Sequence, residues 1–196
     1  MSREKTGTRS RILDCTWRLL ETDPARAVRM ADIAEAAGVS RQAVYLHFPN
    51  RADLLIATTR HIDAMNDVDA RLAASRAAAT GVERLDAYVE ALGNYFPHVH
   101  AVLKALTALR DTDPAAAAAI ADREAAMRHG CTAAIKALEH DNTLHPDHSP
   151  RQATDILWTL LSIHTWERYR HHCGWSQKRY VATMKGMARK VLVAGG

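Results

Sequence analysis

The sequence predicts an all-α protein of about nine helices, and three observations carry that prediction. Alanine is very common, glycine (9) and proline (6) are few among 196 residues, and no β-branched alternation is present. We expect a three-helix N-terminal domain at residues 1–52 and a larger helical domain at residues 53–196. A chain of this length can bury a substantial core.

The first helix is expected from about Thr8 to Glu21, after a basic N-terminal arm. Its apolar residues, such as Ile12 and Leu20, recur at helical spacing and predict one buried face. Cys15 belongs to this pattern, so we interpret it as a small core residue and not as a reactive thiol.

The segment at residues 30–51, MADIAEAAGVSRQAVYLHFPNR, has the spacing of a helix-turn-helix. Ala34 is small enough for another helix to cross closely. Gly38 follows where the first helix must end and the backbone often needs a positive φ. Ser40 can cap the second helix, and Val44 faces back to the first one. The second helix of such a motif enters the DNA major groove, so the segment predicts DNA binding.

Further residues make the likeness more specific: Ile33-Ala34, AGVS at 37–40, YLHF at 45–48, and NR with DLL at 50–55. Over about the first third of its length the chain therefore resembles the TetR family of transcriptional regulators. Arg51 and Asp53 replace the family's usual lysine and glutamate and keep their charges. Arg29 and Met30 stand where the family often has two threonines, one of which commonly contacts a phosphate.

The outward side chains of the second motif helix are candidate DNA contacts. Arg41 can pair with guanine, Gln42 with adenine, and Ala43 can touch a thymine methyl; each good pair contributes roughly 1–3 kcal/mol of discrimination. The resemblance implies that phosphates are held by residues around this helix, with Arg29 replacing the missing hydroxyl by charge. These phosphate-binding candidates are Arg29, Ser40, Tyr45, His47 and Arg51. Phe48 is interpreted as core.

The remaining helices are placed by their start and stop signals. Asn50, with an acidic residue three positions later, opens a helix expected to reach Ala79. Helices at 82–96 and 98–110 should be separated by Pro97, which lacks a backbone N–H.

Two further start signals combine a cap with a proline, Asp113-Pro114 and Ser149-Pro150. They predict helices to about residues 139 and 172, and Ser176 opens a last helix ending near residue 193.

The TetR resemblance implies a homodimer built from the last two long helices, around a domain that encloses a ligand pocket. The helix near residue 160 is apolar around most of its circumference, which indicates that other elements pack against more than one of its sides. The dimer candidates are Leu157, Leu161, Met184, Met187 and Val191. The pocket candidates are Met65, Leu72, Tyr88, Tyr95, Phe96, Leu103, Met127, Trp158, His164, Thr165 and Trp166. Such walls suit a drug-sized, partly hydrophobic effector.

Charge and composition narrow the class of protein. Residues 1–60 hold ten Lys/Arg and seven Asp/Glu, whereas the other 136 residues hold sixteen and fifteen, so most of the net charge of +4 lies in the predicted DNA-binding part. No stretch approaches 18 apolar residues, and the start lacks an apolar signal region. Three widely spaced cysteines fit a reducing cytoplasm, and we expect no membrane partner.

The sequence therefore favours a cytoplasmic, ligand-responsive repressor that binds a palindromic operator as a homodimer. A transcriptional activator stays open, as does a sequence-specific or architectural DNA-binding protein without an inducer. No catalytic motif is present, so we expect neither an enzyme nor a cofactor. Of two histidine groups, the one at 140, 145 and 148 lies in a polar loop without i, i+4 spacing or a nearby cysteine, whereas His98, His100 and His164 could converge in the fold; we expect no metal.

Overall fold

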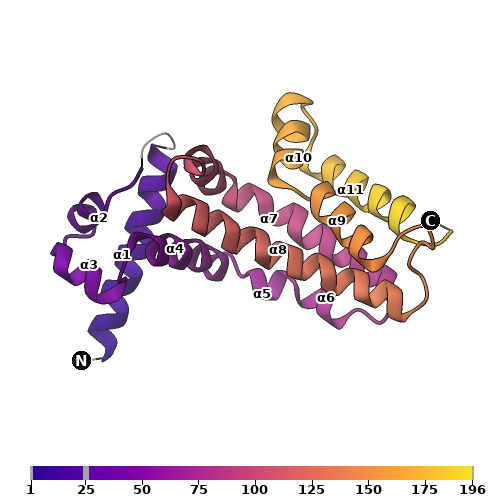
Figure 1. Cartoon of the computed structure of the whole chain (residues 1–196), viewed down its shortest axis with the longest axis horizontal. Coiled ribbons are helices and arrows are strands. Elements are labelled where there is room, and N and C mark those ends of the chain that lie inside the picture. The colour runs from indigo at the N-terminus through magenta and orange to yellow at the C-terminus, as the bar shows by residue number, and fades with distance from the viewer. Residues whose placement is uncertain (1, 24–26, 196) are drawn as a thin grey trace. The chain divides into compact units, whose positions relative to one another are not determined.

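The structure is a computed structural model that describes residues 2–23 and 27–195, with side chains from residue 7 onward. It confirms the all-α prediction: the described chain contains helices and one isolated β-bridge, between Leu144 and Val193 (Figure 1). The helices are α1 (Ser2–Thr22), α2 (Met30–Ala36), α3 (Arg41–His47), α4 (Arg51–Met65), α5 (Val68–Arg71), α6 (Ala73–Ala77), α7 (Gly81–Leu109), α8 (Pro114–His140), α9 (Pro150–Leu160), α10 (Ile163–Glu167), the π-helix η1 (Arg168–His172) and α11 (Gln177–Leu192).

The chain packs into two compact units, and α7 and α8 contribute to both. Unit 1 comprises residues 1–66 and 99–124, and unit 2 comprises residues 67–98 and 125–196. The division into domains at 1–52 and 53–196 stays a prediction, because these two units are defined by packing, and packing alone does not identify functional domains. No helix in the described residues is long and apolar enough to cross a membrane.

In unit 1, α1 packs against α2 and α4, and α2 packs against α3. The side chains that join these helices are fully buried, among them Ile12, Ile33, Val44 and Leu54. Cys15 is buried as predicted, and its Sγ donates to the Ala36 carbonyl at 3.3 Å. This packing makes α1, α2 and α4 a support for the short helix α3.

Most of the predicted helix starts are confirmed by capping bonds. The Asn50 side chain accepts from the Asp53 N–H at 2.9 Å at the start of α4. Asp113 accepts from the Ala115 N–H at 3.0 Å at the start of α8. The hydroxyls of Ser149 and Ser176 cap α9 and α11 in the same way.

The predicted long helix from Asn50 to Ala79 is wrong. It ends at Met65, where the Asn66 side chain donates to the Ile62 carbonyl at 2.9 Å, and Asp67 then takes a left-handed conformation with φ of 52°. A side-chain amide that bonds the last turn competes with helix continuation. The short helices α5 and α6 follow, and unit 1 passes into unit 2 at this point.

The predicted break at Pro97 is also wrong, since α7 runs through it. Proline cannot donate to the carbonyl four residues earlier, which belongs to Gly93. That carbonyl instead accepts from Gln177 Nε2 at 2.8 Å, while Gln177 Oε1 accepts from Trp166 Nε1 at 3.0 Å. A side chain from α11 thus replaces the hydrogen bond that the proline removes.

The predicted helix at 150–172 is divided into α9, α10 and η1. Ser162 adopts extended backbone and caps a new helix by accepting from the Thr165 N–H at 3.1 Å. All three pieces belong to unit 2, whose core combines side chains of α7, α8, α9 and α11 such as Val89, Ile135, Leu157 and Met184.

Candidate nucleic-acid interface

The turn between α2 and α3 has the geometry that the sequence predicts. Gly38 lies in the left-handed region with φ of 62°, and the Val39 N–H donates to the Ala34 carbonyl at 3.0 Å. Ser40 Oγ accepts from the Ala43 N–H at 3.1 Å and caps α3. Val44 is the one fully buried residue among the seven of α3, so it anchors the helix by one side.

The opposite side of α3 faces solvent and holds the predicted base readers. Arg41 and Gln42 are exposed, Ala43 is half-buried, and Tyr45 retains 51% of its surface. Within the described chain, neither Arg41 nor Gln42 has a hydrogen-bond partner that would hold it away from a ligand. A helix anchored by Val44 therefore presents these four residues together.

Sequence reasoning missed Leu46, which also lies on α3 and retains 80% of its surface. The sequence feature that could have indicated Leu46 is its position between Tyr45 and His47, because the buried position of this helix is Val44. An exposed apolar side chain at this position can contact a thymine methyl.

The predicted phosphate-binding residues are only partly brought together. Tyr45 is exposed and His47 half-buried on α3, and the hydroxyl of Ser40 caps the start of the same helix. Arg29 remains largely exposed, but its guanidinium pairs with Asp32, with Nη2 at 2.9 Å from Oδ1. Phe48 is buried as predicted, and the guanidinium of Arg9 lies 5.0 Å from the centre of its ring.

Arg51 is the clear exception, and the structure corrects its predicted role. Its Nη1 donates to Asp113 Oδ1 at 2.7 Å, Nη2 lies 2.6 Å from Asp113 Oδ2, and Nε donates to the Val28 carbonyl. These bonds from Arg51 hold the pKa of Asp113 below its usual value. A guanidinium whose donors are taken up in this way joins α4 to α8, and we no longer assign it to a phosphate.

Comparison with known proteins identifies the N-terminal region. Residues 12–58, which span the second half of α1, the helix-turn-helix and the first half of α4, match the family described as "Bacterial regulatory proteins, tetR family". The chain is also 29% identical over 186 residues to the HTH-type transcriptional repressor LfrR of Mycolicibacterium smegmatis, covering 95% of this chain and 84% of that protein. Residues 12–58 are thus a TetR-family DNA-binding region, and the chain as a whole is similar to TetR-family transcriptional regulators.

Solved structures share this TetR fold over nearly the whole chain. NalD, the secondary repressor of the MexAB-OprM multidrug efflux pump in Pseudomonas aeruginosa, has a TM-score of 0.71 at 21% identity, covering 98% of this chain and 100% of that one. The fatty acid degradation regulator FadR of Bacillus halodurans has a TM-score of 0.72 at 18% identity, covering 91% and 96%. TetR-family relatives are DNA-binding regulators and not enzymes, in agreement with the expectation from sequence.

The predicted pocket residues do not form one group. Six belong to the unit 2 core or pack against it: Leu72, Tyr88, Phe96, Met127, Trp158 and Trp166. Met65 and Leu103 belong to unit 1, and His164 of unit 2 is exposed, so none of these three is part of the unit 2 core. Tyr95 is buried, and the Thr165 hydroxyl lies 2.9 Å from that of Ser162.

Within the unit 2 core, polar groups of α7 and α8 bond to one another. Tyr88 Oη donates to the Met127 carbonyl at 2.9 Å, and Cys131 Sγ donates to Tyr88 Oη at 3.8 Å. Burial raises the pKa of Tyr88, and it raises that of Cys131 to about 12, so both groups are neutral at pH 7. A Cβ at Gly130 would lie 2.6 Å or less from this tyrosine ring and hydroxyl, which explains the glycine.

Three of the five dimer candidates are wrong. Leu157, Leu161 and Met184 are fully buried within a single chain, so they have no surface left for a partner. Periodicity shows that a helix is covered on several sides but not by which molecule. Met187 and Val191 on α11 retain 38% and 39% of their surface.

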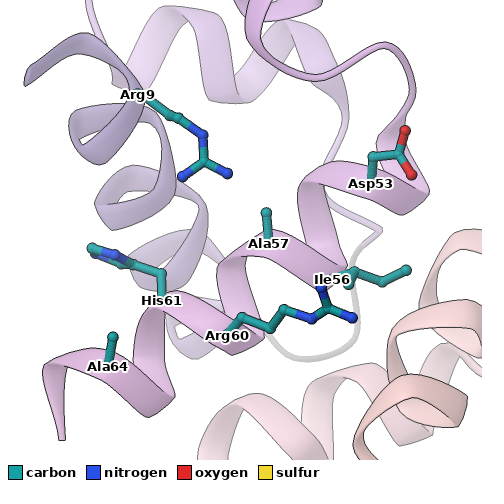
Figure 2. Close-up of a pocket in the computed structure, with 7 residues that line it drawn as sticks. All are labelled: Arg9, Asp53, Ile56, Ala57, Arg60, His61 and Ala64. Atoms are coloured by element: carbon teal, nitrogen blue, oxygen red, sulfur yellow. The ribbon is translucent and has the colours of Figure 1, made fainter. Parts of the chain in front are cut away.

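Unit 1 also contains an open groove of about 410 Å³ between α1 and α4 (Figure 2). Arg9 lines it from α1, and Asp53, Ile56, Ala57, Arg60, His61 and Ala64 line it from α4. None of the predicted pocket residues lines this groove. His61 Nε2 lies 2.7 Å from Asp14 Oδ1, and Arg60 pairs with Asp122, so much of its polar rim is already satisfied.

The histidines and cysteines are the candidates for a metal site. In the part of the chain that the structure describes, no group of three or more His, Cys, Asp or Glu side chains is arranged to hold a metal ion. The rings of His145 and His148 lie 5.6 Å apart, and His145 is next to Asp147. The three cysteines are free thiols, and only Cys173 is exposed.

Proposed function

We propose that this protein is a homodimeric repressor that binds a palindromic operator and is released by a small, partly hydrophobic molecule in the cytoplasm. The observation that carries the proposal is α3, whose single buried anchor, Val44, leaves Arg41, Gln42 and Tyr45 exposed on its other side. In a helix-turn-helix protein this face enters the major groove.

The roles on α3 follow from the chemistry of its side chains. Arg41 would pair with guanine and Gln42 with adenine, while Ala43 would touch a thymine methyl. Tyr45, His47 and Ser40 would bond backbone phosphates and set the register of the helix in the groove. Arg29 would add charge if its pair with Asp32 opens.

A homodimer is supported by the outer face of α11. Met187 and Val191 are exposed there, and a Cβ at Gly186 would meet no atom within 4 Å, so another helix can approach closely. Two copies related by a twofold axis would place two reading helices on half-sites about one helical turn apart.

The effector is proposed to bind in unit 2, among the six grouped pocket candidates. Two polar atoms of this region, Trp158 Nε1 and Tyr180 Oη, are buried without a hydrogen-bond partner in the described chain. Leaving such atoms unpaired costs about 1–3 kcal/mol each, which a ligand with a hydrogen-bond acceptor would offset. Relatives that regulate multidrug efflux or fatty acid degradation are consistent with a partly apolar effector.

Coupling between effector and DNA is proposed to run through α8 and α4. Three ion pairs join these helices within unit 1: Asp113 with Arg51, Asp122 with Arg60, and Arg123 with Asp63. Burial alone would raise the pKa of Asp122, but bonds from Arg60 and Arg123 outweigh it and lower that pKa. An effector acts on this path only by binding one arrangement of the helices better than the other.

The first experiment is selection of bound sequences from a random duplex pool, at a stated near-physiological salt concentration. A palindromic consensus is the expected result and would supply the probe for an effector screen. Binding without sequence preference would favour an architectural protein and remove the base-reading role from Arg41 and Gln42. With the consensus as probe, a screen for compounds that both raise the melting temperature and release DNA separates an inducible repressor from a regulator without an inducer.

A further inference from the structure

The charge of the chain is segregated beyond the reading head. Residues 168–196 contain seven Lys/Arg and no Asp/Glu, whereas residues 61–167 contain nine and fifteen. Two of the seven cations are neutralised within the chain, Lys185 by Glu90 and Arg189 by Asp86. Arg168 and Arg170 of η1, and Lys178 and Arg179 of the first turn of α11, have no ion pair with a carboxylate in the described part of the chain, so a local positive field remains.

These four residues belong to η1 and the start of α11, which follow α10 in unit 2; Figure 1 shows the backbone of this segment between the labels α10 and α11. The rings of Tyr169 and Trp175 stack with centroids 4.2 Å apart, and the Arg179 guanidinium lies 4.3 Å from the Trp175 ring centre. Arg170 donates to the Trp175 carbonyl, and Gly174 reverses the chain with φ of 66°. Two arginines of this turn, Arg170 and Arg179, are therefore held by contacts within it.

We propose that this C-terminal basic surface, formed by Arg168, Arg170, His172, Lys178 and Arg179, binds the phosphate backbone of duplex DNA as a second contact outside α3. Four of the five are exposed, and Arg170 is half-buried. Several cations with no interspersed carboxylate match a uniform polyanion, whose phosphates recur every few ångströms along the duplex.

An anionic membrane fits the same charge less well. Peripheral membrane binding by a protein segment combines cations with exposed apolar side chains that enter the interface. The large apolar residues exposed in the described chain are Tyr45, Leu46, Met65, Met187 and Val191, and none lies on this turn. Duplex DNA is therefore the partner that both the charge and the polarity of the surface favour.

The test uses the full chain with the reading helix disabled by Arg41→Ala and Tyr45→Ala, and a labelled duplex without the operator. Into this background we would introduce Arg168→Gln with Lys178→Gln, or the matched control Arg151→Gln with Lys136→Gln. Both pairs remove one exposed arginine and one exposed lysine of unit 2, and thermal melts would verify that both variants are folded. The measurement is the dissociation constant between about 50 and 200 mM salt.

The expected result is that the Arg168/Lys178 variant reduces the slope of log affinity against log salt by about 2, while the control leaves it unchanged. Equal slopes in the two variants would overturn the proposal. Binding to phosphatidylglycerol vesicles or to polyglutamate, without binding to the duplex, would overturn it as well. The proposed repressor is tested separately, by selecting operator sequences with the Arg168/Lys178 variant in which α3 is intact. The repressor proposal and the second-contact proposal can therefore fail independently.

Discussion

The reading helix α3 and the core of unit 2 use their side chains in opposite ways. Of the seven residues of α3 only Val44 is buried, and most of the others face solvent. In unit 2, Tyr88, Phe96 and Trp166 are 3–5% exposed, and each is packed or bonded to its own chain. A partner can reach the first region as it stands, whereas an effector in the second must exchange contacts that already exist.

That difference separates the two halves of the function. DNA recognition rests on a motif of some twenty consecutive residues, whose geometry is set by a glycine, a cap and one buried valine. The proposed effector recognition would depend on how four helices from distant parts of the sequence pack, so that small shifts in packing would decide which molecule fits. Variants that act on one region and spare the other can therefore test the comparison.

The largest expected effect is on operator binding. Arg41→Ala and Tyr45→Ala should each weaken operator affinity roughly 100-fold, since a dimer loses the contact in both half-sites at about 1–3 kcal/mol each. Because both side chains are exposed, the melting temperature should not change. Fluorescence anisotropy with the selected operator measures the loss, and Arg151→Ala on α9 is the control. Full affinity in either variant would remove that residue from the interface.

Removal of the Arg51–Asp113 pair should destabilise the protein at neutral pH. Asp113→Asn leaves Arg51 partly buried without its counter-charge, which should lower the free energy of unfolding by about 2 kcal/mol. Urea titrations of both proteins at pH 7 measure this difference. The exposed Asp69→Asn is the control, because its pair with Arg76 is open to solvent.

The same pair predicts the direction of a pH effect. Because the folded protein lowers the pKa of Asp113, the pair stabilises the native state above the ordinary carboxylate pKa of about 4. That contribution is lost as pH falls through the lower, folded pKa. The stability gap between wild type and Asp113→Asn should therefore be full at pH 7 and shrink below about pH 4; a gap that grows in acid would contradict the assignment.

Charge on the outer face of α11 should disrupt dimerisation but not folding. Met187→Glu or Val191→Glu places a carboxylate where we propose a partner helix, and should weaken dimerisation about 10-fold or more. Sedimentation across a concentration series measures the dimer dissociation constant. Ala125→Glu on α8, an equally exposed position of unit 2, provides the comparison. An unchanged dimer would move the interface away from these two residues.

The smallest effect is expected in unit 2, where Gln177 compensates for Pro97. Gln177→Ala deprives the Gly93 carbonyl of its Gln177 bond and should cost about 1 kcal/mol. In the Gln177→Ala protein, a second substitution, Pro97→Ala, supplies a backbone N–H that can donate to the Gly93 carbonyl. Pro97→Ala should therefore raise the free energy of unfolding more in the Gln177→Ala protein than in the wild type. A double-mutant cycle of unfolding free energies measures the coupling. Strictly additive effects would mean that the two residues are independent.

The sequence by itself determined the helical class, the helix-turn-helix and most of the helix starts. These features depend on residues within one or two turns of each other: Gly38 supplies a positive φ, and Ser40, Asn50 and Ser149 supply caps. Such local preferences act whatever surrounds them, and so a reading of neighbouring residues suffices.

Only the tertiary structure decided which side chains remained free for partners. Pro97 is accommodated within α7, where Gln177 bonds the Gly93 carbonyl from 84 positions away, and Arg51 is held by Asp113 at a separation of 62. Leu157 and Met184 are apolar, as interface residues often are, but they are buried in the core of their own chain. The physical reason is that burial and ion pairing depend on elements distant in sequence, which periodicity and propensity do not encode.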